Sequence, residues 1–437
     1  MGEELSMKGD CIRARSHDPL PGPPAGGLHD AGAPPVSERL RLLNLYKVFS
    51  NSPERAMSML AAGASKEGVF TATGAVVGLN NVSLGVPAGA IYMIMGLSGS
   101  GKSTLARCIN RLNEPTAGRI LLDSRDIVTL SDKELREIRR TRISMVFQHF
   151  ALLPNRSVIE NAEFGLKLRG VPLRERRRRA EEVLAIVGLA KWAQHLPHEL
   201  SGGMRQRVGL ARALATDADV LIMDEPFSAL DPLIRAEMQD ELLRLQHTLK
   251  KTILFITHDF QEALKLGNRI AIMRDGEVVR EGTPEAIVLD PASEYVAAFT
   301  REVDCLRLFD ARSIMNQATP IAAAQGWVIV GREAGEGASF VVDAEARIHG
   351  TLTRADLDKV RNGVPANSLM SQAFIAVSGS MKLIEVARRY QASRSIAVVD
   401  DQGRLIGTLA PEQILARIAS IAPSAYPTTV GEPNARC

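Results

Sequence analysis

A glycine-rich segment constrains the fold of this chain more than any other feature. Residues 96–103 read GLSGSGKS and directly follow a short apolar run, Ile91–Met95. Glycines in such a segment let backbone N–H groups turn inward around an anion without Cβ clashes. Residues 104–110 suit the first turns of a helix, whose N-terminus attracts negative charge. The segment therefore predicts a strand, a phosphate-binding loop and a helix in succession.

The residues of this loop have separate tasks. Lys102 would neutralise the β- and γ-phosphates of a bound nucleotide, and the Ser103 hydroxyl would ligate Mg²⁺. A plain glycine turn before a helix is the alternative, but the strand and helix on either side favour the nucleotide. The expected nucleotide contacts are Gly96, Leu97, Ser98, Gly99, Ser100, Gly101, Lys102, Ser103 and Thr104.

Two acidic residues end a second apolar run. Residues 220–223 read VLIM, and Asp224 and Glu225 follow them. Asp224 can hold Mg²⁺, directly or through water. Glu225 can polarise the attacking water as a general base. Two acids after a strand are more often an ordinary solvated strand end, but together with a phosphate loop they predict nucleotide hydrolysis.

Apolar runs alternate with helical patterns between about residues 40 and 300. Short runs with polar or glycine-rich ends suit the buried strands of a parallel sheet. They lie at residues 91–95, 143–147, 220–223 and 253–257. One helical face is formed by Ala180, Val183, Leu184 and Val187. The alternation predicts an α/β domain.

Composition excludes several classes of protein. The chain has 437 residues, which allows two to four domains, and a net charge of +3, too small to favour nucleic-acid binding. Its four cysteines form no CxxC pair, which argues against a disulfide scaffold or zinc ribbon and favours a reducing cytosol. No apolar run reaches 18 residues, so we expect no membrane span. The N-terminus lacks the pattern of a secretory signal.

The sequence divides into three expected parts. Residues 1–38 are rich in Pro and Gly and predict a disordered tail. Residues 39–300 form the expected α/β domain. Residues 301–437 contain an internal repeat, in which Gly350 and Gly407 occupy equivalent positions 57 residues apart. Each copy predicts a strand, a turn, a second strand and a helix.

Six ordered motifs resemble those of the ABC ATPases. Beside the phosphate loop and the acidic pair, they are the Q-loop glutamine Gln148, the signature LSGGMRQ at residues 200–206, the D-loop SALD at residues 228–231 and the switch histidine His258. The resemblance covers about residues 40–300 and implies an ABC ATPase fold with a helical subdomain at about 145–205. It implies ATP and Mg²⁺ as cofactors. It also implies that Glu225, His258 and Gln148 are catalytic, with Gln148 a further Mg²⁺ ligand beside Ser103 and Asp224.

The signature forms a second expected anion site. Ser201 and the Gly202 and Gly203 amides precede a helix. In ABC ATPases this motif faces the γ-phosphate bound to the other subunit, and Asp231 of the D-loop is expected beside the nucleotide. One chain has one phosphate loop and one signature. We therefore expect a homodimer in which two chains, head to tail, close two ATP sites.

A closer resemblance is to the ATPase subunits of glycine betaine and proline betaine importers, the quaternary-amine family. Residues 46–49 read YKVF and precede an insertion of about 25 residues, expected to be helical. The stretches 93–97, 201–214 and 227–235 and the repeat pair read as in that family. The resemblance implies ATP-driven uptake of an osmolyte such as glycine betaine, proline betaine or choline, and hence osmoprotection.

The same resemblance implies the partners and the location of the chain. Integral membrane permease subunits are expected as direct partners and a solute-binding protein as an indirect one, with no nucleic acid. The expected place is the cytoplasmic face of the bacterial inner membrane, as a peripheral subunit. Phe49 is expected to stack on adenine, with Phe70 as the runner-up.

The repeat pair resembles tandem CBS modules and implies an α+β regulatory domain. Thr353 and Asp356 resemble the pair that holds a ribose in adenine-nucleotide-binding modules, whereas the second copy has Ala410 and Gln413 at these positions. Structural dimerisation, or sensing through a charged surface, is the preferred alternative to nucleotide binding.

Other functions stay open at this point. A soluble ABC ATPase acting on ribosomes or DNA, or an importer for a different small solute, would share the nucleotide motifs. A single cassette without sustained heptads or a cysteine cluster argues against the first. A purely regulatory module is disfavoured by the intact Lys102, Asp224, Glu225 and His258. The basic run at residues 173–179 is interpreted as a solvated helix face rather than a nucleic-acid arm.

Overall fold

The structure is a computed structural model that describes residues 37–147, 151–301, 303–324, 326–331, 339–390 and 395–419. Residues 1–36 of the expected tail and Gln148 lie outside these ranges. Glu38, placed in the tail from the sequence, belongs instead to a strand, because it pairs with Pro87.

A six-stranded sheet carries the predicted nucleotide motifs. Its order is β10-β9-β3-β8-β7-β6, with β10 antiparallel at one edge and the other strands parallel. The strands are β3 Ile91–Met95, β6 Ile143–Val146, β7 Val220–Asp224, β8 Thr252–Ile256, β9 Arg269–Arg274 and β10 Glu277–Gly282. The four strands expected from apolar runs are confirmed to within one residue at their ends. Three of them, β3, β7 and β8, are buried along their whole length.

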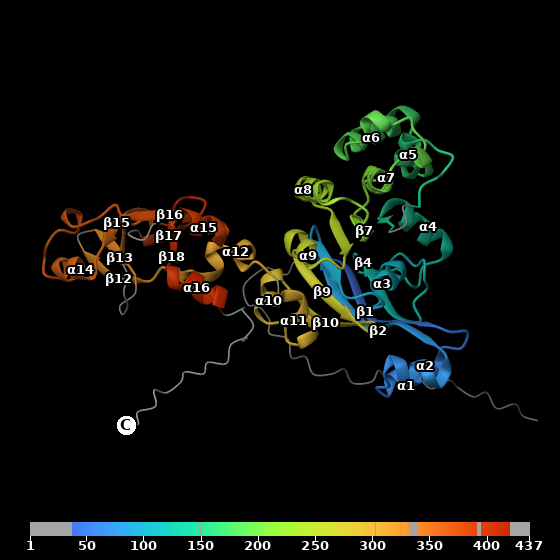
Figure 1. Cartoon of the computed structure of the whole chain (residues 1–437), viewed down its shortest axis with the longest axis horizontal. Helices are drawn as coiled ribbons and strands as arrows, with labels where there is room; N and C mark the ends of the chain where they lie inside the picture. The colour runs from blue at the N-terminus through green and yellow to red at the C-terminus, as the bar shows by residue number, and fades with distance from the viewer. Residues whose placement is uncertain are drawn as a thin grey trace, which may run out of the picture. The chain divides into compact units, whose positions relative to one another are not determined.

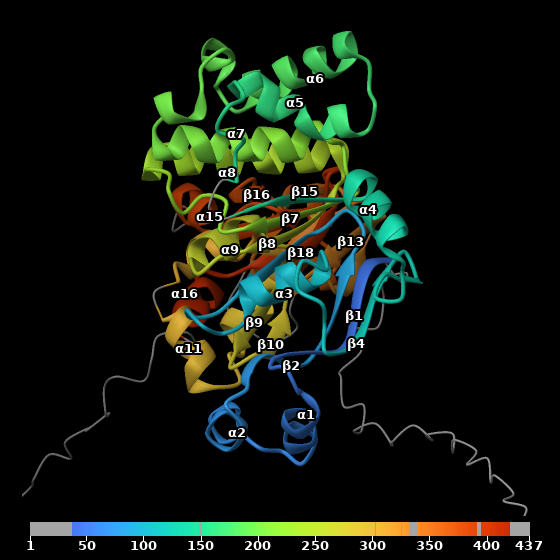
Figure 2. The same ribbon diagram turned by 90° about the vertical axis from the view of Figure 1, so that its right-hand side faces the viewer.

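A second, antiparallel sheet was not indicated by the sequence patterns. Its order is β2-β1-β4-β5. The strands are β1 Glu38–Phe49, β2 Val76–Pro87, β4 Ala117–Leu122 and β5 Arg125–Asp126. The insertion between β1 and β2 is helical, as predicted, and forms α1 Glu54–Ala61 and α2 Lys66–Thr73. Figure 2 shows α1 and α2 at the opposite end of this part of the chain from α5 and α6.

Helices connect the strands and form a separate helical layer. The first group is α3 Lys102–Ile109, α4 Asp132–Thr141, α5 Val158–Leu168, α6 Leu173–Ile186 and α7 Gly202–Ala215. The second is α8 Pro232–Leu249, α9 Phe260–Leu266, α10 Pro284–Leu289 and α11 Glu294–Thr300, with short 3₁₀ turns at Ala190–Trp192 and Pro197–Glu199. Helices α5, α6 and α7 pack on one another (Figure 1). Residues 145–146, included in the expected helical subdomain, instead pair with β7 as part of β6.

Helix α6 confirms the predicted amphipathic pattern. Ala180, Val183, Leu184 and Val187 are all buried. The basic run begins the same helix, and its Arg178 and Arg179 pair with Glu182. None of the described helices combines the length and the apolar character needed to cross a bilayer.

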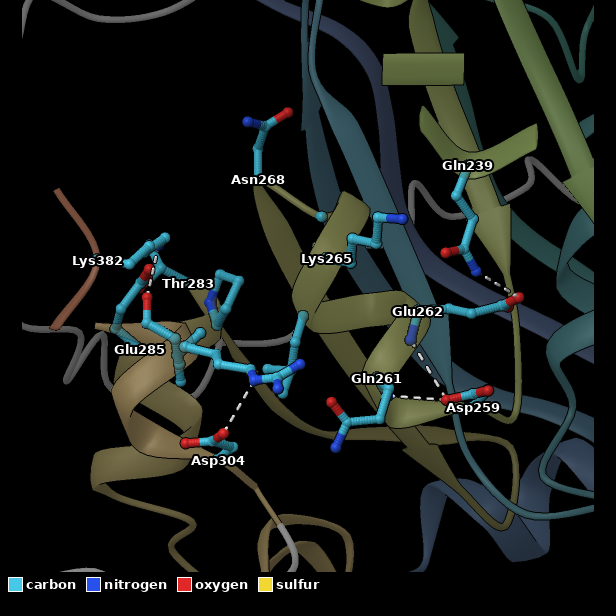
Figure 3. A pocket seen from close by; sticks show the side chains of 15 residues that line it. Gln239, Asp259, Gln261, Glu262, Lys265, Asn268, Thr283, Glu285, Asp304 and Lys382 are labelled. Carbon is cyan, nitrogen blue, oxygen red and sulfur yellow. Dashed lines mark hydrogen bonds and ion pairs between the residues drawn. The ribbon is translucent and has the colours of Figure 1, made fainter. Parts of the chain in front are cut away.

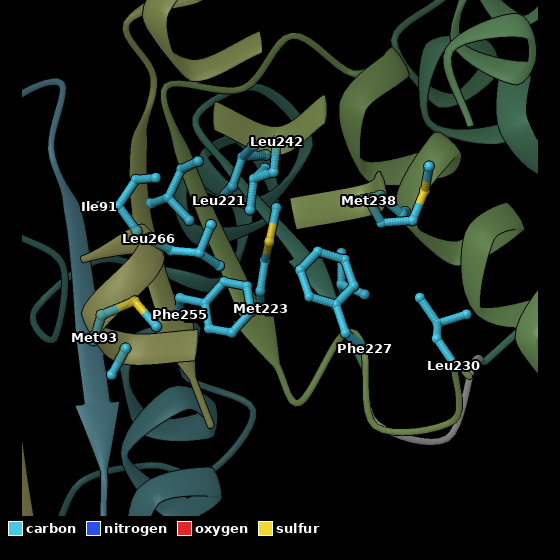
Figure 4. Close-up of a cluster of buried hydrophobic side chains, with 14 of the residues drawn as sticks. Ile91, Met93, Leu221, Met223, Phe227, Leu230, Met238, Leu242, Phe255 and Leu266 are labelled. Carbon is cyan, nitrogen blue, oxygen red and sulfur yellow. The ribbon is translucent and has the colours of Figure 1, made fainter. Parts of the chain in front are cut away.

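The main apolar core lies between the six-stranded sheet and its helices. Figure 4 shows Met223 and Phe255 from neighbouring strands pointing at Phe227, which follows β7. The rings of Phe227 and Phe255 have centroids 5.5 Å apart. This packing fixes the position of the carboxyl end of β7, where Asp224 lies, within the sheet.

The C-terminal region contains two four-stranded sheets, ordered β11-β18-β17-β16 and β12-β13-β14-β15. The strands are β11 Asn316–Gln317, β12 Pro320–Ala324, β13 Trp327–Val330, β14 Ser339–Val342, β15 Ile348–Leu352, β16 Phe374–Ser378, β17 Ser395–Val399 and β18 Leu405–Leu409. The helices are α12 Cys305–Leu308, α13 Ala311–Ile314, α14 Arg354–Arg361, α15 Leu383–Arg389 and α16 Pro411–Ala419, with a 3₁₀ turn at Ala366–Ser368.

The internal repeat is visible as two equivalent turns. Asp343 Oδ1 accepts hydrogen bonds from the Glu345 and Arg347 amides between β14 and β15. In the second copy, Asp400 Oδ1 accepts from the Gln402 and Arg404 amides between β17 and β18. A helix follows each pair of strands, as the sequence predicted.

Phe255→Ala is expected to lower the free energy of unfolding by about 3–5 kcal/mol, because it leaves a cavity next to Phe227 in the main core. Denaturant titration of the purified chain measures the change. Phe70 is 56% exposed, so Phe70→Ala is the matched control and should change stability by about 0.5 kcal/mol or less. Equal losses in the two variants would contradict the assignment of this core.

Candidate active site

The phosphate loop connects β3 to α3 through backbone conformations that favour glycine. Gly99 has φ of 79° and Gly101 has φ of 103°. A Cβ atom at Gly101 would lie 2.6 Å from the Gly78 carbonyl oxygen, so a larger residue would push the loop away from β2. A strand, a glycine-rich loop and a helix thus follow one another at β3 and α3, as the sequence predicted.

Lys102 is buried under this loop. Its Nζ donates hydrogen bonds to the carbonyl oxygens of Gly96 at 2.7 Å and Leu97 at 2.9 Å. Burial lowers the pKa of Lys102, and the nearby carboxylates of Glu225 and Asp224 partly oppose that shift. The phosphate loop thus fixes the position of the Lys102 ammonium group through its own carbonyl oxygens.

The two residues proposed to hold Mg²⁺ are in direct contact. Ser103 Oγ donates a hydrogen bond to Asp224 Oδ1 at 3.0 Å. Asp224 is buried at the end of β7, and this burial raises its pKa while the Ser103 hydrogen bond acts in the opposite direction. A hydroxyl and a carboxylate at this separation are ligands that Mg²⁺ prefers.

Glu225 and His258 come together from neighbouring strand ends. His258 Nδ1 lies 3.3 Å from Glu225 Oε2. Glu225 has a positive φ of 49°, a sparsely populated conformation for a residue with a side chain. Its N–H donates to the Ile256 carbonyl at 3.0 Å, which ties the strained position to β8. Glu225 directly follows Asp224 in the chain, and both Glu225 and His258 share a cavity lining with Ser103.

A cavity of about 560 Å³ joins these groups. Its lining includes the loop residues 97–99 and 101–104, and Glu225, His258 and Phe49. Phe49 is 42% exposed, and Lys47 Nζ lies 4.9 Å from its ring centroid. Phe70, the runner-up for adenine stacking, is exposed but is not among the described residues that line this cavity.

The signature and D-loop residues do not line this cavity in the described part of the chain. Ser201 caps α7 by accepting a hydrogen bond from the Met204 amide at 3.3 Å, and Gly202 and Gly203 form the first turn. Asp231 caps α8 by accepting from the Ile234 amide at 3.1 Å. One chain therefore brings the phosphate loop, Glu225 and His258 to this cavity, whereas Ser201, Gly202 and Gly203 at the start of the signature helix lie outside its lining.

Gln206 joins the signature helix to Glu225, a link that the motif alone did not reveal. Its Nε2 donates to the Glu225 carbonyl at 3.1 Å, and its Oε1 accepts from the Ala229 amide at 3.1 Å. Gln206 is 2% exposed, so both bonds are protected from water. Its place in the signature LSGGMRQ was the only signal in the sequence.

A buried carboxyl group, that of Glu262, braces the chain next to His258. Glu262 accepts hydrogen bonds from Thr257 Oγ1 at 2.6 Å and from Gln239 Nε2 at 3.1 Å. Figure 3 shows Gln239 aimed at Glu262, and Asp259 capping the start of α9. Because Thr257 directly precedes His258, this network fixes the end of β8 from which the histidine projects.

Tyr295 of α11 braces the phosphate loop from its other side. Its hydroxyl accepts a hydrogen bond from the Leu97 amide at 3.3 Å and donates to the Met273 carbonyl at 3.1 Å. The Tyr295 ring contacts Phe299, which in turn lies near Phe260 at the start of α9. No sequence pattern singled out Tyr295, because its role depends on the docking of α11.

This fold and this arrangement of residues define an ABC-type ATPase. The sequence profile described as ABC transporter matches residues 79–228, and the profile described as CBS domain matches residues 366–420, the second copy of the repeat.

Three relatives specify the family. The glycine betaine transport ATP-binding protein OpuAA of Bacillus subtilis is 43% identical over 389 residues, covering 85% of this chain and 92% of OpuAA. ProV of Escherichia coli is a glycine betaine/proline betaine transport system ATP-binding protein. It is 43% identical over 389 residues, covering 86% of this chain and 96% of ProV. The trimethylamine N-oxide transport system ATP-binding protein TmoW of Ruegeria pomeroyi is 50% identical over 297 residues, covering 67% of this chain and 86% of TmoW. The chain belongs to the family of ATP-binding subunits of quaternary-amine ABC transporters, which includes OpuAA and ProV.

Glu262→Gln is expected to flatten the pH dependence of stability. Burial raises the pKa of Glu262 above its ordinary value of 4.5, so the folded chain holds this proton more tightly than the unfolded chain. The resulting stability is fully present below the unfolded pKa and is lost as the pH rises through the folded pKa. The glutamine variant has no such proton and lacks this loss.

Thermal unfolding of both chains from about pH 4.5 to about pH 8 measures the difference. Glu181→Gln, at an exposed position on α6, is the control and should keep the slope of the parent. Parallel curves for the parent and Glu262→Gln would show that the carboxyl group does not titrate differently in the folded chain.

Proposed function

We propose that this chain binds Mg²⁺–ATP in the cavity beside the phosphate loop and hydrolyses it to drive an importer of a quaternary-amine osmolyte. The observation that carries the proposal is the assembly of Lys102, Ser103, Glu225 and His258 around one cavity, with Asp224 bonded to Ser103. The loop amides and Lys102 would bind the β- and γ-phosphates. Phe49 would stack on adenine, because it lines the same cavity.

Hydrolysis requires a base and a group that positions the γ-phosphate. Glu225 would accept a proton from the attacking water, and its strained backbone aims the carboxylate into the cavity. His258, held beside Glu225 by the Thr257–Glu262 network, would contact the γ-phosphate. Gln148, outside the described residues, is proposed to act with them as a further ligand to Mg²⁺ and the water.

The residues present fit Mg²⁺. Ser103 and Asp224 offer a hydroxyl and a carboxylate oxygen in contact, and such a partial set suits Mg²⁺, which keeps phosphate oxygens and waters as its other ligands. When bound, the ion would neutralise charge between the β- and γ-phosphates.

Two chains would complete each site. Ser201, Gly202 and Gly203 lie apart from the cavity of their own chain, so their helix N-terminus is available to the nucleotide of a second copy. Asp231 of the D-loop would lie at the same interface. A head-to-tail homodimer would complete both nucleotide sites through one interface, because each chain would supply its signature to the nucleotide of the other.

The solute and the membrane partners are proposed from the relatives. OpuAA and ProV are named for glycine betaine and proline betaine, and TmoW for trimethylamine N-oxide. We propose glycine betaine, proline betaine or choline as the solute class, permease subunits as the direct membrane partners at the cytoplasmic face, and a solute-binding protein upstream of them. These names favour transport over a soluble ATPase that acts on ribosomes or DNA.

The CBS pair is proposed to regulate transport. In the first copy, Thr353 Oγ1 donates to Asp356 Oδ2 at 2.5 Å and caps α14. Lys359 also pairs with Asp356, at 3.1 Å. These bonds use the groups that a ribose would need, which supports sensing through charge or a structural role over nucleotide binding at this position.

Glu225→Gln is expected to slow ATP hydrolysis by about 100-fold or more while ATP binding is retained, because the amide keeps the shape but cannot take the proton. Chains reconstituted with their permease should then lose uptake of labelled glycine betaine, proline betaine and choline in parallel with hydrolysis. Glu237→Gln, exposed on α8, is the matched control. Hydrolysis at the parent rate would remove Glu225 from the mechanism, and uptake of none of these solutes by the parent would refute the solute class.

Ser201→Arg is expected to block closure of the dimer but leave ATP binding to the single chain intact, because Ser201 lies outside the cavity of its own chain. Size-exclusion chromatography with ATP, in the Glu225→Gln background, measures dimer formation. Ser131→Arg removes a comparable exposed helix cap on α4 and controls for the loss of capping. An ATP-dependent dimer in Ser201→Arg would contradict the two-chain site.

A further inference from the structure

The helical insert between β1 and β2 is fixed to the antiparallel sheet. An apolar cluster joins them, formed by Val48, Ala56, Leu60, Val69, Ala75 and Val77. Ser65 Oγ accepts a hydrogen bond from the Gly68 amide at 3.1 Å, which starts α2 at Lys66. Gly74, with φ of 68°, ends α2 and returns the chain to β2. The position of Lys66 is therefore set by a cap and a packed helix.

Lys66 reaches from this insert to the phosphate loop. Its Nζ lies 3.4 Å from the carbonyl oxygen of Gly99, and its side chain lines the same cavity as Phe49 and Lys102. The insert therefore contributes a side chain to the proposed nucleotide site, from a segment that none of the nucleotide motifs includes.

The contact with Gly99 leaves the charge of Lys66 largely uncompensated. A neutral carbonyl at 3.4 Å is a weak partner for an ammonium group. Within the part of the chain that the structure describes, no carboxylate lies at ion-pair distance from Lys66. Lys102, in contrast, makes two short bonds to carbonyl oxygens. Of the two lysines, Lys66 is the one that can turn to a new anion without breaking strong bonds.

We propose that Lys66 is a second cation of the nucleotide site and binds a phosphate oxygen of the bound nucleotide. The proposal rests on the proposed function, that this cavity holds ATP. An ammonium–phosphate bond is charge-assisted and stronger than the long bond to Gly99, and the flexible lysine stem allows the exchange. Because Lys66 is only half-buried, the gain in affinity depends on ionic strength.

Lys66→Met removes the charge and keeps a stem of similar length. We expect it to weaken ATP and ADP binding about three- to tenfold at about 50 mM NaCl, measured by calorimetry with Mg²⁺. The ratio to the parent should shrink towards one at about 500 mM NaCl, because salt screens the exposed charge. Lys66→Arg should recover most of the affinity. Lys133→Met, exposed on α4, makes the same charge change away from the cavity and should match the parent.

Three outcomes would overturn the proposal. The first is that Lys66→Met binds ATP as tightly as the parent at low salt. The second is that the loss of ATP affinity in Lys66→Met is the same at high salt as at low salt. The third is that Lys66→Arg does not recover the affinity. The last two would mean that Lys66 acts by packing on the phosphate loop, and equal unfolding temperatures of the variants separate that effect from misfolding. A parent chain that binds neither ATP nor ADP would instead refute the proposed function, which is a different result.

Discussion

An ammonium group removed from water organises the ATPase site. Lys102 is 7% exposed, and a buried ammonium group without hydrogen-bond partners strongly destabilises the folded state. The phosphate loop supplies two carbonyl oxygens, and the carboxylates of Asp224 and Glu225 add a compensating field. The phosphate loop thus folds around its own lysine. The strained backbone of Glu225 persists because β7, β8 and Gln206 hold it.

The motifs of the site could be predicted because each depends on local chemistry. A strand–glycine loop–helix, an apolar run that ends in two acids and a histidine after a strand are visible in short stretches of sequence. The strands themselves follow from apolar runs, since parallel strands buried on both faces need no alternation. The antiparallel sheet was missed because two helices separate β1 from β2, so the pairing is not a local hairpin.

The residues that support the site could not be predicted in the same way. Each of these residues acts through a partner that is distant in sequence, such as the Gly99 carbonyl for Lys66; they are Gln206, Glu262, Tyr295 and Lys66. Residues of these types are common in helices, and only the packing of those helices against the rest of the chain brings their side chains to their hydrogen-bond partners. The repeat shows the same limit. Its turns are equivalent, but Gln413 bonds the Ala410 amide and the Ile314 carbonyl, contacts that the sequence alignment of the two copies did not indicate.

The separation of the signature from the cavity of its own chain has a kinetic consequence under the proposed two-chain closure. Free chains would then hydrolyse ATP at a rate that rises with the square of their concentration, since each turnover begins with an encounter. Two chains held on one membrane complex would meet at an effective concentration in the millimolar range, set by the geometry of the complex. A membrane partner could therefore switch on hydrolysis by proximity alone, without altering any residue of the nucleotide site.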